Sequence, residues 1–524
     1  MPAPVSTAVV PELSHSKSII LAAHYASSAD LKALRAVISH HRSTLQGETL
    51  LRVLLCLPET TNPELYIPLL EYAISGTDDG GIIRDEAAAL PEEPSTLPVS
   101  EMSEKAAVRR VKQQLPRFAL LGGFSNHGDD LLFSFLVHRS RAIDRETGAL
   151  SIVADLLSPF RTRLTEVERY LTGVVEVLLR LVYHYALEEE GGGGEGDLPD
   201  GMRRLEEFDR IAPQVGARML LARCGNLQTV VSDLEGLVGP FLRSKDNDYE
   251  GWEVVWEWLR GKAMDGSWDE FVEIATRWSG PRGHEALEDE FARIAIAGCY
   301  LCRETDLRTW DGMRAICRRV ASLGSARDTT PRDHKAPDSV GDLFDKDNLL
   351  SAPNSESLRL LDMMITSASV LSIPLASVAE ITLEGSHDDQ KTLLARHVRS
   401  GPNWTRRSDD EWRVMRKNVM WMQAKAKVLG KLTAGETEGT VLMALLAAAK
   451  FALVKEIYVN GRREREGVGT DTRWVDEFTE SDVERGVLDA FQEFYDNASN
   501  GNKTRGSMRN ALGAYVSFCC YRWR

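Results

Sequence analysis

The sequence has few aromatic residues and no long apolar run. Phe, Trp and Tyr make up 7% of its 524 residues. The longest apolar stretch, residues 441–449, ends at Lys450 and falls short of the ~20 residues that a membrane-spanning helix needs. The N-terminus lacks a basic segment followed by an apolar core, so we expect no secretory signal. These absences predict a chain that stays in the cytosol.

Positive charge is scarce as well. The chain has 63 basic and 78 acidic residues, which gives a net charge of −15. A general nucleic-acid binder needs a basic stripe that neutralises phosphates, so we expect no nucleic-acid partner. The same balance argues weakly against tight binding to anionic lipid through charge alone.

Cysteines are scattered, and their spacing predicts no site. There are seven, an odd number in a long chain, which does not suggest a disulfide framework. Cys299, Cys302 and Cys317, with His284, are candidates for a metal site, but their spacing matches no zinc pattern. We interpret Cys299 and Cys302 as small apolar residues on a buried helix face.

Intact catalytic motifs are missing too. The sequence contains no complete metalloprotease, phosphate-binding, calcium-loop or nucleophile-elbow pattern. We therefore predict that the chain is not an enzyme. We expect it to have no catalytic residue, no metal, no cofactor and no small-molecule substrate.

Helical periodicity is what the sequence has in abundance, whereas strand alternation is almost absent. Residues 31–38 are an example, because Leu31, Leu34 and Val37 recur three apart and line one helical face. Ser28 is the expected N-cap of this helix. Most periodic segments have the length of ordinary globular helices, and turns of a few residues separate the first three of them.

This pattern predicts an all-α fold, an irregular α-solenoid of stacked helical hairpins. A short helix pair cannot bury its own apolar face, but stacked pairs can. A compact bundle rarely grows this long on one core. The expected parts are N-terminal helical hairpins over 1–75, an acidic Gly/Pro loop over 76–100, a helical solenoid over 101–324 with a flexible Gly-rich insertion at 188–200, a polar loop over 325–353, a C-terminal helical solenoid over 354–514 and an atypical tail over 515–524.

The densest aromatic cluster comprises Trp252, Trp256, Trp258, Trp268 and Trp278. Trp252 and Trp256 share one helical face. Clusters of this kind occur in packed cores and in exposed partner grooves. We favour a core, because large exposed apolar patches are rare on soluble chains.

Two stretches carry a family resemblance. The first comprises residues 21–30 (LAAHYASSAD), 54–66 (LLCLPETTNPELY) and 68–70 (PLL). The second is residues 495–506 (YDNASNGNKTRG), and a run so dense in Asn, Asp and Gly is the more specific of the two. Both resemble the Sec thirty-nine family of secretory-pathway proteins, which is related to the neuroblastoma-amplified sequence protein. The positions of the second motif are Asp496, Asn497, Ser499, Asn500, Gly501, Asn502, Thr504, Arg505 and Gly506.

The resemblance implies an α-solenoid subunit of the Dsl tethering complex, which captures retrograde vesicles from the Golgi at the endoplasmic reticulum. It implies a SNARE protein and other tether subunits as partners, and neither catalysis nor a cofactor. It also implies a cytoplasmic chain that is peripheral on the endoplasmic reticulum membrane and associates with it indirectly, through those partners. Two alternatives remain: a coat-type α-solenoid scaffold elsewhere in trafficking, and an all-α metal-dependent enzyme using Cys299, Cys302 and His284.

The second motif also has an interpretation in turn chemistry alone. Residues 487–495 are periodic, and the Asn and Gly residues that follow favour helix caps and left-handed turns. A new helix is expected near Thr504, so the motif predicts a tight connection within a helical hairpin. We favour this structural role over a contact surface. Family members continue with further helices, so the 354–514 solenoid is expected to be truncated here, at the end where the family attaches to its complex.

Overall fold

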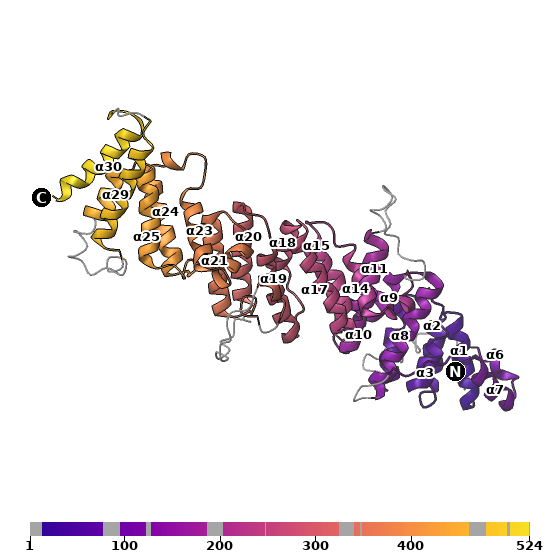
Figure 1. Ribbon diagram of the computed structural model, residues 1–524. Helices are drawn as coiled ribbons and strands as arrows, with labels where there is room; N and C mark the ends of the chain where they lie inside the picture. The colour runs from indigo at the N-terminus through magenta and orange to yellow at the C-terminus, as the bar shows by residue number, and fades with distance from the viewer. Residues whose placement is uncertain are drawn as a thin grey trace, which may run out of the picture. The chain divides into compact units, whose positions relative to one another are not determined.

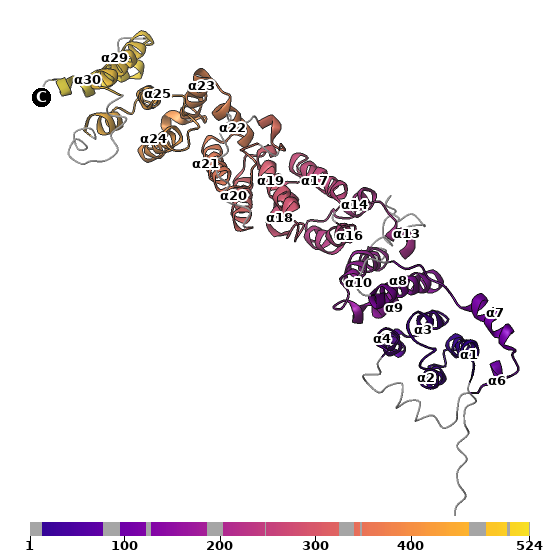
Figure 2. The same ribbon diagram turned by 90° about the horizontal axis from the view of Figure 1, so that it is seen from below.

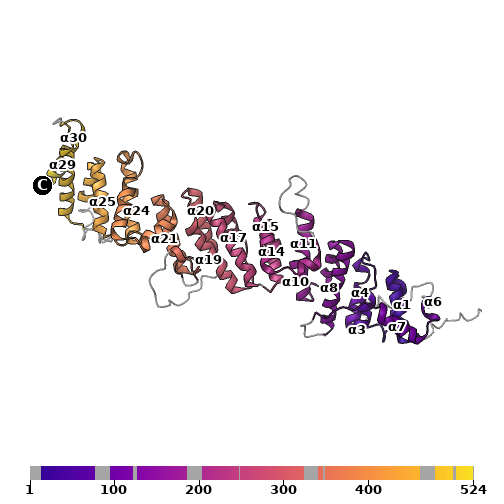
Figure 3. The same ribbon diagram turned by 45° about the vertical axis from the view of Figure 1, so that its right-hand side comes forward.

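The computed structural model describes residues 13–76, 95–121, 127–185, 203–246, 248–323, 340–345, 348–460, 478–499 and 503–522. All regular structure in these ranges is helical, and they contain no β-strand. The expected all-α fold is therefore confirmed. Figures 1, 2 and 3 show the helices from three directions.

The chain forms two compact units, Met1–Val255 and Trp256–Arg524. Within each unit, helices that follow one another in sequence pack side by side, as α1 does with α2 and α24 with α25 (Figure 1). This local stacking is what a solenoid of hairpins requires inside a unit. The solenoid itself stays a prediction.

Apart from the 21-residue α8, the first unit is built mainly from short helices, several of them continued by 3₁₀ or π turns. They are α1 (His15–Ser27), α2 (Leu31–His40), α3 (Gly47–Leu54), η1 (Pro63–Leu65), α4 (Ile67–Ser75), α6 (Leu97–Ser100), α7 (Glu104–Gln114), α8 (His127–Thr147), α9 (Leu150–Leu157), η2 (Ser158–Phe160), α10 (Thr165–Tyr170), η3 (Leu171–Val175), α11 (Glu176–Arg180), η4 (Leu181–Tyr185), α13 (Leu205–Asp209), α14 (Pro213–Leu221), α15 (Val230–Asp233), η7 (Leu234–Val238) and α16 (Gly239–Ser244). The next helix, α17 (Tyr249–Met264), contains the division between the units.

The second unit has longer helices. They are α18 (Trp268–Arg277), α19 (Glu285–Leu301), α20 (Leu307–Ser322), η8 (Val340–Asp342), α21 (Ser355–Leu371), α22 (Leu375–Leu383), α23 (His387–Val398), η9 (Trp404–Arg406), α24 (Asp409–Ala424), α25 (Ala434–Ala447), α26 (Phe451–Val454), η10 (Lys455–Asn460), α29 (Glu480–Asp496) and α30 (Gly506–Arg522). Residues 515–522, part of the expected atypical tail, belong to α30.

The start of α2 corrects the expected cap. Ser28 ends α1 instead, and its hydroxyl donates to the carbonyls of His24 and Tyr25, both at 3.1 Å. Ala29 then adopts a left-handed conformation with φ of 56° and reverses the chain. The N-cap of α2 is Asp30, whose carboxylate accepts a 3.0 Å hydrogen bond from the Ala33 amide. The expectation failed because it placed the helix start before this reversal.

The tryptophan cluster lies mainly in the core, as predicted. Trp252, Trp256 and Trp278 are at most 1% exposed, and Trp268 is 4% exposed. Trp258 is half-buried. In the second unit, the rings of Trp256 and Trp278 both pack against Phe291, with centroids 6.2 and 5.0 Å away. The cluster therefore does not form an exposed partner groove.

The expected loops fall largely outside the described residues. This holds for 77–94, for the whole insertion 188–200, and for 325–339 with 346–347. The described part of the polar loop over 325–353 is partly packed, because Leu343 and Leu350 are at most 1% exposed in the core of the second unit, whereas Asp342, Asp345 and Leu349 are exposed. The leucines of this polar run lie in two short apolar pairs, residues 343–344 and 349–350, and two pairs have no periodicity that would mark Leu343 and Leu350 as buried.

In the described ranges, no individual helix combines the length and the apolar composition needed to cross a bilayer. The helices α21 and α22 reach the necessary length and apolar composition only when they are taken together, and the chain bends by 111° between them. Both helices contribute residues to the core of the second unit.

Candidate interaction surfaces

The family-like motif lies at the connection between α29 and α30, which pack against each other (Figures 1 and 3). Asp496 is the last residue of α29, and Asn497 ends the helix by donating its amide to the Glu493 carbonyl at 3.1 Å. Gly506 opens α30 with a left-handed φ of 63°. The motif is thus a connection between two paired helices, and the new helix begins two residues after Thr504.

The described motif residues are solvent-facing. Asp496, Asn497, Ser499, Thr504, Arg505 and Gly506 are all exposed. Asn500, Gly501 and Asn502 lie outside the described residues. Exposed turn residues of this kind offer hydrogen-bonding groups to a partner but form no buried site for chemistry.

An apolar surface that the sequence analysis missed lies beside the motif. Leu488 and Tyr495 on α29 are 52% and 56% exposed, and Tyr515 on α30 is 49% exposed. The half-buried Phe491 joins them, because its ring centroid lies 6.1 Å from that of Tyr495 and 5.6 Å from that of Tyr515. We call these four residues the terminal aromatic face.

The spacing of this face could have revealed it. Leu488, Phe491 and Tyr495 recur at i, i+3 and i+7, which places them on one stripe of α29. Val483 and Val487 form a different stripe of the same helix, and they are buried in the core of the second unit. A helix with two apolar stripes can bury one in its own domain and present the other to a partner.

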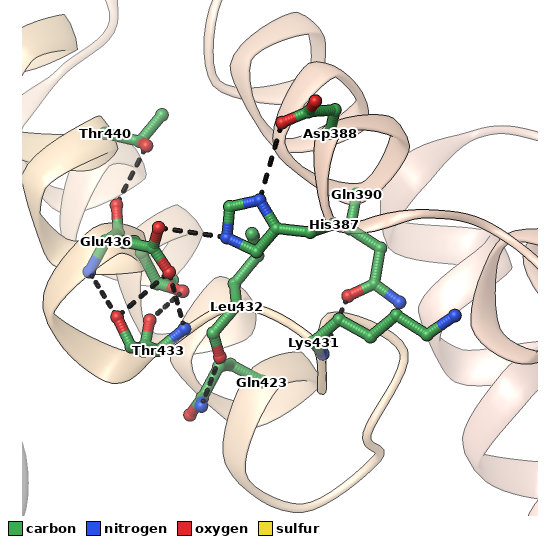
Figure 4. A network of polar contacts seen from close by, with 10 residues as sticks. His387, Asp388, Gln390, Gln423, Lys431, Leu432, Thr433, Glu436 and Thr440 are labelled. Atoms are coloured by element: carbon green, nitrogen blue, oxygen red, sulfur yellow. Dashed lines mark hydrogen bonds and ion pairs between the residues drawn. The ribbon is translucent and has the colours of Figure 1, made fainter.

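A second surface lies between α23 and α25, whose N-termini are linked through side chains (Figure 4). Each helix starts with a capping box, formed by Ser386 with Asp389 and by Thr433 with Glu436. One oxygen of Glu436 accepts from the Thr433 amide at 2.9 Å, and the other lies 2.9 Å from Nε2 of His387. Glu436 therefore caps its own helix and contacts the first residue of its neighbour.

Two side-chain amides, one fully buried and one half-buried, strengthen this junction. Gln390, which is fully buried, donates to the Ile381 carbonyl at 3.2 Å and accepts from the Lys431 amide at 3.0 Å (Figure 4). Gln423 donates to the Leu432 carbonyl at 3.1 Å. Four segments are thereby held in one arrangement, which makes the surface above them rigid.

The shifted pKa values of the junction follow from these contacts. Hydrogen bonding to Glu436, and secondarily to Asp388, raises the pKa of His387. The backbone of Thr433 is the main cause of the lowered pKa of Glu436. Both side chains are partly exposed, at 43% and 37%, so the pair lies at the surface and encloses no reaction site.

A groove of about 330 Å³ lies beside this junction. Ala395, Val398 and Met443 contribute apolar atoms to it, and Lys391 and Arg399 contribute positive charge. The groove has the size of one or two side chains, and Glu436 and Thr440 also line it. It suits an apolar anchor residue of a peptide next to a carboxylate, rather than catalysis.

The cysteine candidates do not assemble into a metal site with His284. Cys299 and Cys302 are buried at the end of α19, whereas His284 is exposed at the start of the same helix. Fifteen residues of helix separate His284 from Cys299, which is ~22 Å at the usual rise. No single ion can bridge that distance.

The cysteines themselves behave as core residues. Burial raises the pKa of Cys302 to about 11 and that of Cys317 to about 12. The Cys299 thiol donates to the Ala295 carbonyl of its own helix, at 3.5 Å. Among the residues that the structure describes, no group of three or more His, Cys, Asp or Glu is placed to hold a metal ion.

Comparison with protein families gives a match over most of the chain. The family model described as "Secretory pathway protein Sec39" matches residues 19–518. The matched range contains both resembling stretches, the junction of α23 and α25 and the terminal aromatic face. A search of curated proteins finds no match.

Proposed function

The chain belongs to the Sec39 family of secretory pathway proteins, and on that premise we propose that it is a non-catalytic scaffold subunit of a vesicle-tethering complex. Membership gives it a role in the secretory pathway. The proposal adds that it acts in retrograde transport from the Golgi to the endoplasmic reticulum, where it binds a SNARE protein and other tether subunits. The family match over residues 19–518 is the observation that carries the proposal, because it extends over nearly the whole chain.

In the proposed mechanism, the chain acts by holding its partners in fixed positions. Stacked helices hold exposed side chains at fixed places within each unit, so a partner docks on a preformed surface and loses little entropy in ordering it. The terminal aromatic face is the proposed attachment surface for a helix of another tether subunit. Tyrosine is enriched among the residues that dominate binding energy at interfaces, and an apolar stripe is the usual seat of an amphipathic helix.

Co-purification from cells tests this function. We expect the full chain to recover a SNARE protein and tether subunits under mild lysis. The double variant Leu488→Asp, Tyr495→Asp should lose the tether subunits, because a charge buried against an apolar partner surface is costly. Glu493→Lys is the control, since Glu493 is exposed on the opposite side of the same helix and the substitution changes the net charge by the same amount.

Recovery of neither class of partner by the unmodified chain would overturn the tethering proposal. Recovery of coat subunits in their place would favour the alternative, a coat-type scaffold, because fold alone does not separate the two. The metal-dependent enzyme is the least supported alternative. Stoichiometric zinc in the purified chain would revive it, although the separation of His284 from Cys299 speaks against it.

A further inference from the structure

The helix α7 carries a basic face in the first unit. Lys105, Val108, Arg109 and Lys112 recur at i, i+3, i+4 and i+7, so their side chains share one side of the helix. All four are exposed, and Val108 in the middle of the group is 40% exposed. Ala107 is the buried residue of α7 and points to the opposite side. The basic face is thus directed away from the protein core.

The structure holds this helix firmly in place. α7 packs along α1, with the outer side of α7 at the edge of the N-terminal helices in Figure 2. At its first turn, Glu104 accepts a hydrogen bond from the Ser14 hydroxyl of the chain just before α1. At its other end, Arg52 of α3 donates to the carbonyls of Pro116 and Leu115, at 2.8 and 3.3 Å. The basic face is therefore preformed rather than assembled on binding.

The charge of this segment contrasts with that of the chain. Residues 101–121 contain five basic and two acidic residues, a net charge of +3, whereas the whole chain carries −15. One of the two acids, Glu104, is engaged with Ser14. Within the described ranges, no carboxylate forms an ion pair with Lys105, Arg109 or Lys112. Their charges are thus available to an anionic partner.

Exposed apolar side chains accompany the positive charge. Leu120 and Leu121, which follow α7, are 53% and 39% exposed. The Leu121 amide donates to the Ser134 hydroxyl at 2.7 Å, which fixes this segment to α8. Val108 lies among the basic residues of α7 and the two leucines follow the helix in sequence, so a membrane surface would meet apolar as well as positively charged side chains.

Shape favours a membrane over an acidic protein. The basic face is the convex outer side of a single helix, and its charges extend over seven residues, ~10 Å along the axis. An acidic peptide recognised in extended form needs a groove with walls, whereas a lipid surface offers a plane of phosphates and accepts apolar side chains between them. The combination of convexity, charge and exposed leucines fits the plane better.

We propose that Lys105, Val108, Arg109, Lys112, Leu120 and Leu121 bind directly to the surface of a membrane that contains anionic phospholipid. This contact is additional to the attachment through partner proteins in the proposed function, and it does not depend on that function. Three basic residues on a chain of net negative charge give weak binding that falls with salt. Such a contact orients the first unit on a membrane to which partner proteins have already brought the chain.

Flotation of the purified full chain with lipid vesicles tests the contact. We expect binding to phosphatidylcholine vesicles that contain phosphatidylserine, little binding to phosphatidylcholine alone, and loss of binding as ionic strength rises. Each basic residue near an anionic surface changes the partition about fivefold, so Lys105→Gln, Arg109→Gln, Lys112→Gln together should weaken binding about a hundredfold. Leu120→Ser, Leu121→Ser should weaken binding at every salt concentration.

The control is a triple variant with the same net charge, Arg396→Gln, Lys417→Gln, Lys425→Gln, which changes three exposed residues of the second unit. It should bind as the unmodified chain does. Equal loss in both triple variants would overturn the assignment to α7, as would equal binding to both kinds of vesicle. Binding to polyglutamate without binding to vesicles would also overturn it and would assign the face to an acidic protein. No tether subunit is present in this assay, so its outcome is independent of co-purification.

Discussion

Among the residues that the structure describes, each unit has one charged side chain that is fully buried, and the two charges are compensated in different ways. In the first unit, Arg139 on α8 is fully buried and donates to the carbonyls of Leu57 and Pro58, both at 2.7 Å. In the second unit, Glu438 on α25 is fully buried and accepts from the guanidinium of Arg416 and from the Tyr458 hydroxyl. Arg139 is stabilised by these two carbonyl dipoles and, at 3.7 Å, by the partly exposed carboxylate of Glu59, whereas Glu438 forms hydrogen bonds directly with an opposite charge.

The difference matters for the surfaces that each unit presents. Arg139 fixes α8 to the turn after α3, the helix whose Arg52 holds the end of α7. Glu438 links α25 to α24 and η10, and α25 packs against α29. A buried charge is therefore connected through one intervening helix to the basic face in one unit, and through the packing of α25 on α29 to the terminal aromatic face in the other. Substitutions that break these buried contacts test how firmly each surface is held in place.

The largest effect is expected from Arg416→Met. This substitution leaves the Glu438 carboxylate buried with one neutral partner, and breaking a buried ion pair from one side costs about 3–5 kcal/mol. Urea unfolding, with hydrogen exchange on α24 and α25 to locate the change, measures the loss. The double variant Arg416→Met, Glu438→Leu should recover much of the stability, because no charge is then left without a partner. A loss below about 1 kcal/mol in the single variant would show that Glu438 is not held by the ion pair.

Arg139→Met should be somewhat less costly. The substitution leaves two carbonyl oxygens without donors, and the carboxylate that loses its partner, Glu59, is partly exposed to water, so the expected loss is about 2–4 kcal/mol. Hydrogen exchange on α8 and on the segment before η1 reports it. Arg139→Lys is the matched control, because it keeps the charge and loses the planar pair of donors. If the lysine variant were as stable as the unmodified protein, the paired hydrogen bonds to Leu57 and Pro58 would not be what Arg139 contributes.

Tyr458→Phe tests the neutral partner of Glu438. The phenol donates to the carboxylate at 2.8 Å in a fully buried site, and hydrogen bonds to charged groups contribute about 1.5–3 kcal/mol. We expect the free energy of unfolding to fall by about 1.5 kcal/mol, the lower end of that range, because Arg416 still neutralises the charge of Glu438. Thermal unfolding measures it. A loss as large as that of Arg416→Met would mean that the two compensations, by dipole and by charge, are equivalent.

Much of the fold could be predicted from the sequence because periodicity reports which side chains are buried. Leu34 and Val37 on α2 are buried, and so is Trp256, as the spacing of these residues indicated. The N-cap of α2 was placed wrongly because backbone reversal at Ala29 depends on φ, which residue type alone does not fix. Leu343 and Leu350 were missed because their burial depends on helices far away in sequence.

The candidate surfaces were harder to predict than the fold. The net charge of the chain concealed the local excess on α7, because a sum over 524 residues says nothing about one helix face. The terminal aromatic face has a helical period, yet period alone does not show which of two apolar stripes on α29 is buried. The pairing of His387 with Glu436 joins residues far apart in sequence, and it requires the packing of α23 against α25.

The smallest effect concerns that exposed pair, which shows what the contact of carboxylate and cation does when water surrounds it. The pKa of His387 should lie above the usual value of about 6.5, because Glu436 and then Asp388 accept hydrogen bonds from the protonated ring. Any stability from the pair is therefore complete below that usual value and is lost as the pH rises through the higher pKa of the folded state.

NMR titration of the imidazole signals measures this shift, and Glu436→Gln should return the pKa of His387 toward its usual value. His397 on the same helix is the internal control, because burial, aided by Arg407, lowers its pKa to about 4. It lies outside the junction and should titrate unchanged in the variant. If His387 kept its raised pKa without the Glu436 charge, Asp388 would be the dominant partner, and the link between the N-termini of α23 and α25 would be a hydrogen bond without an ionic contribution. The exposed pair would then differ in kind from the buried pair at Glu438, and not only in its degree of solvation.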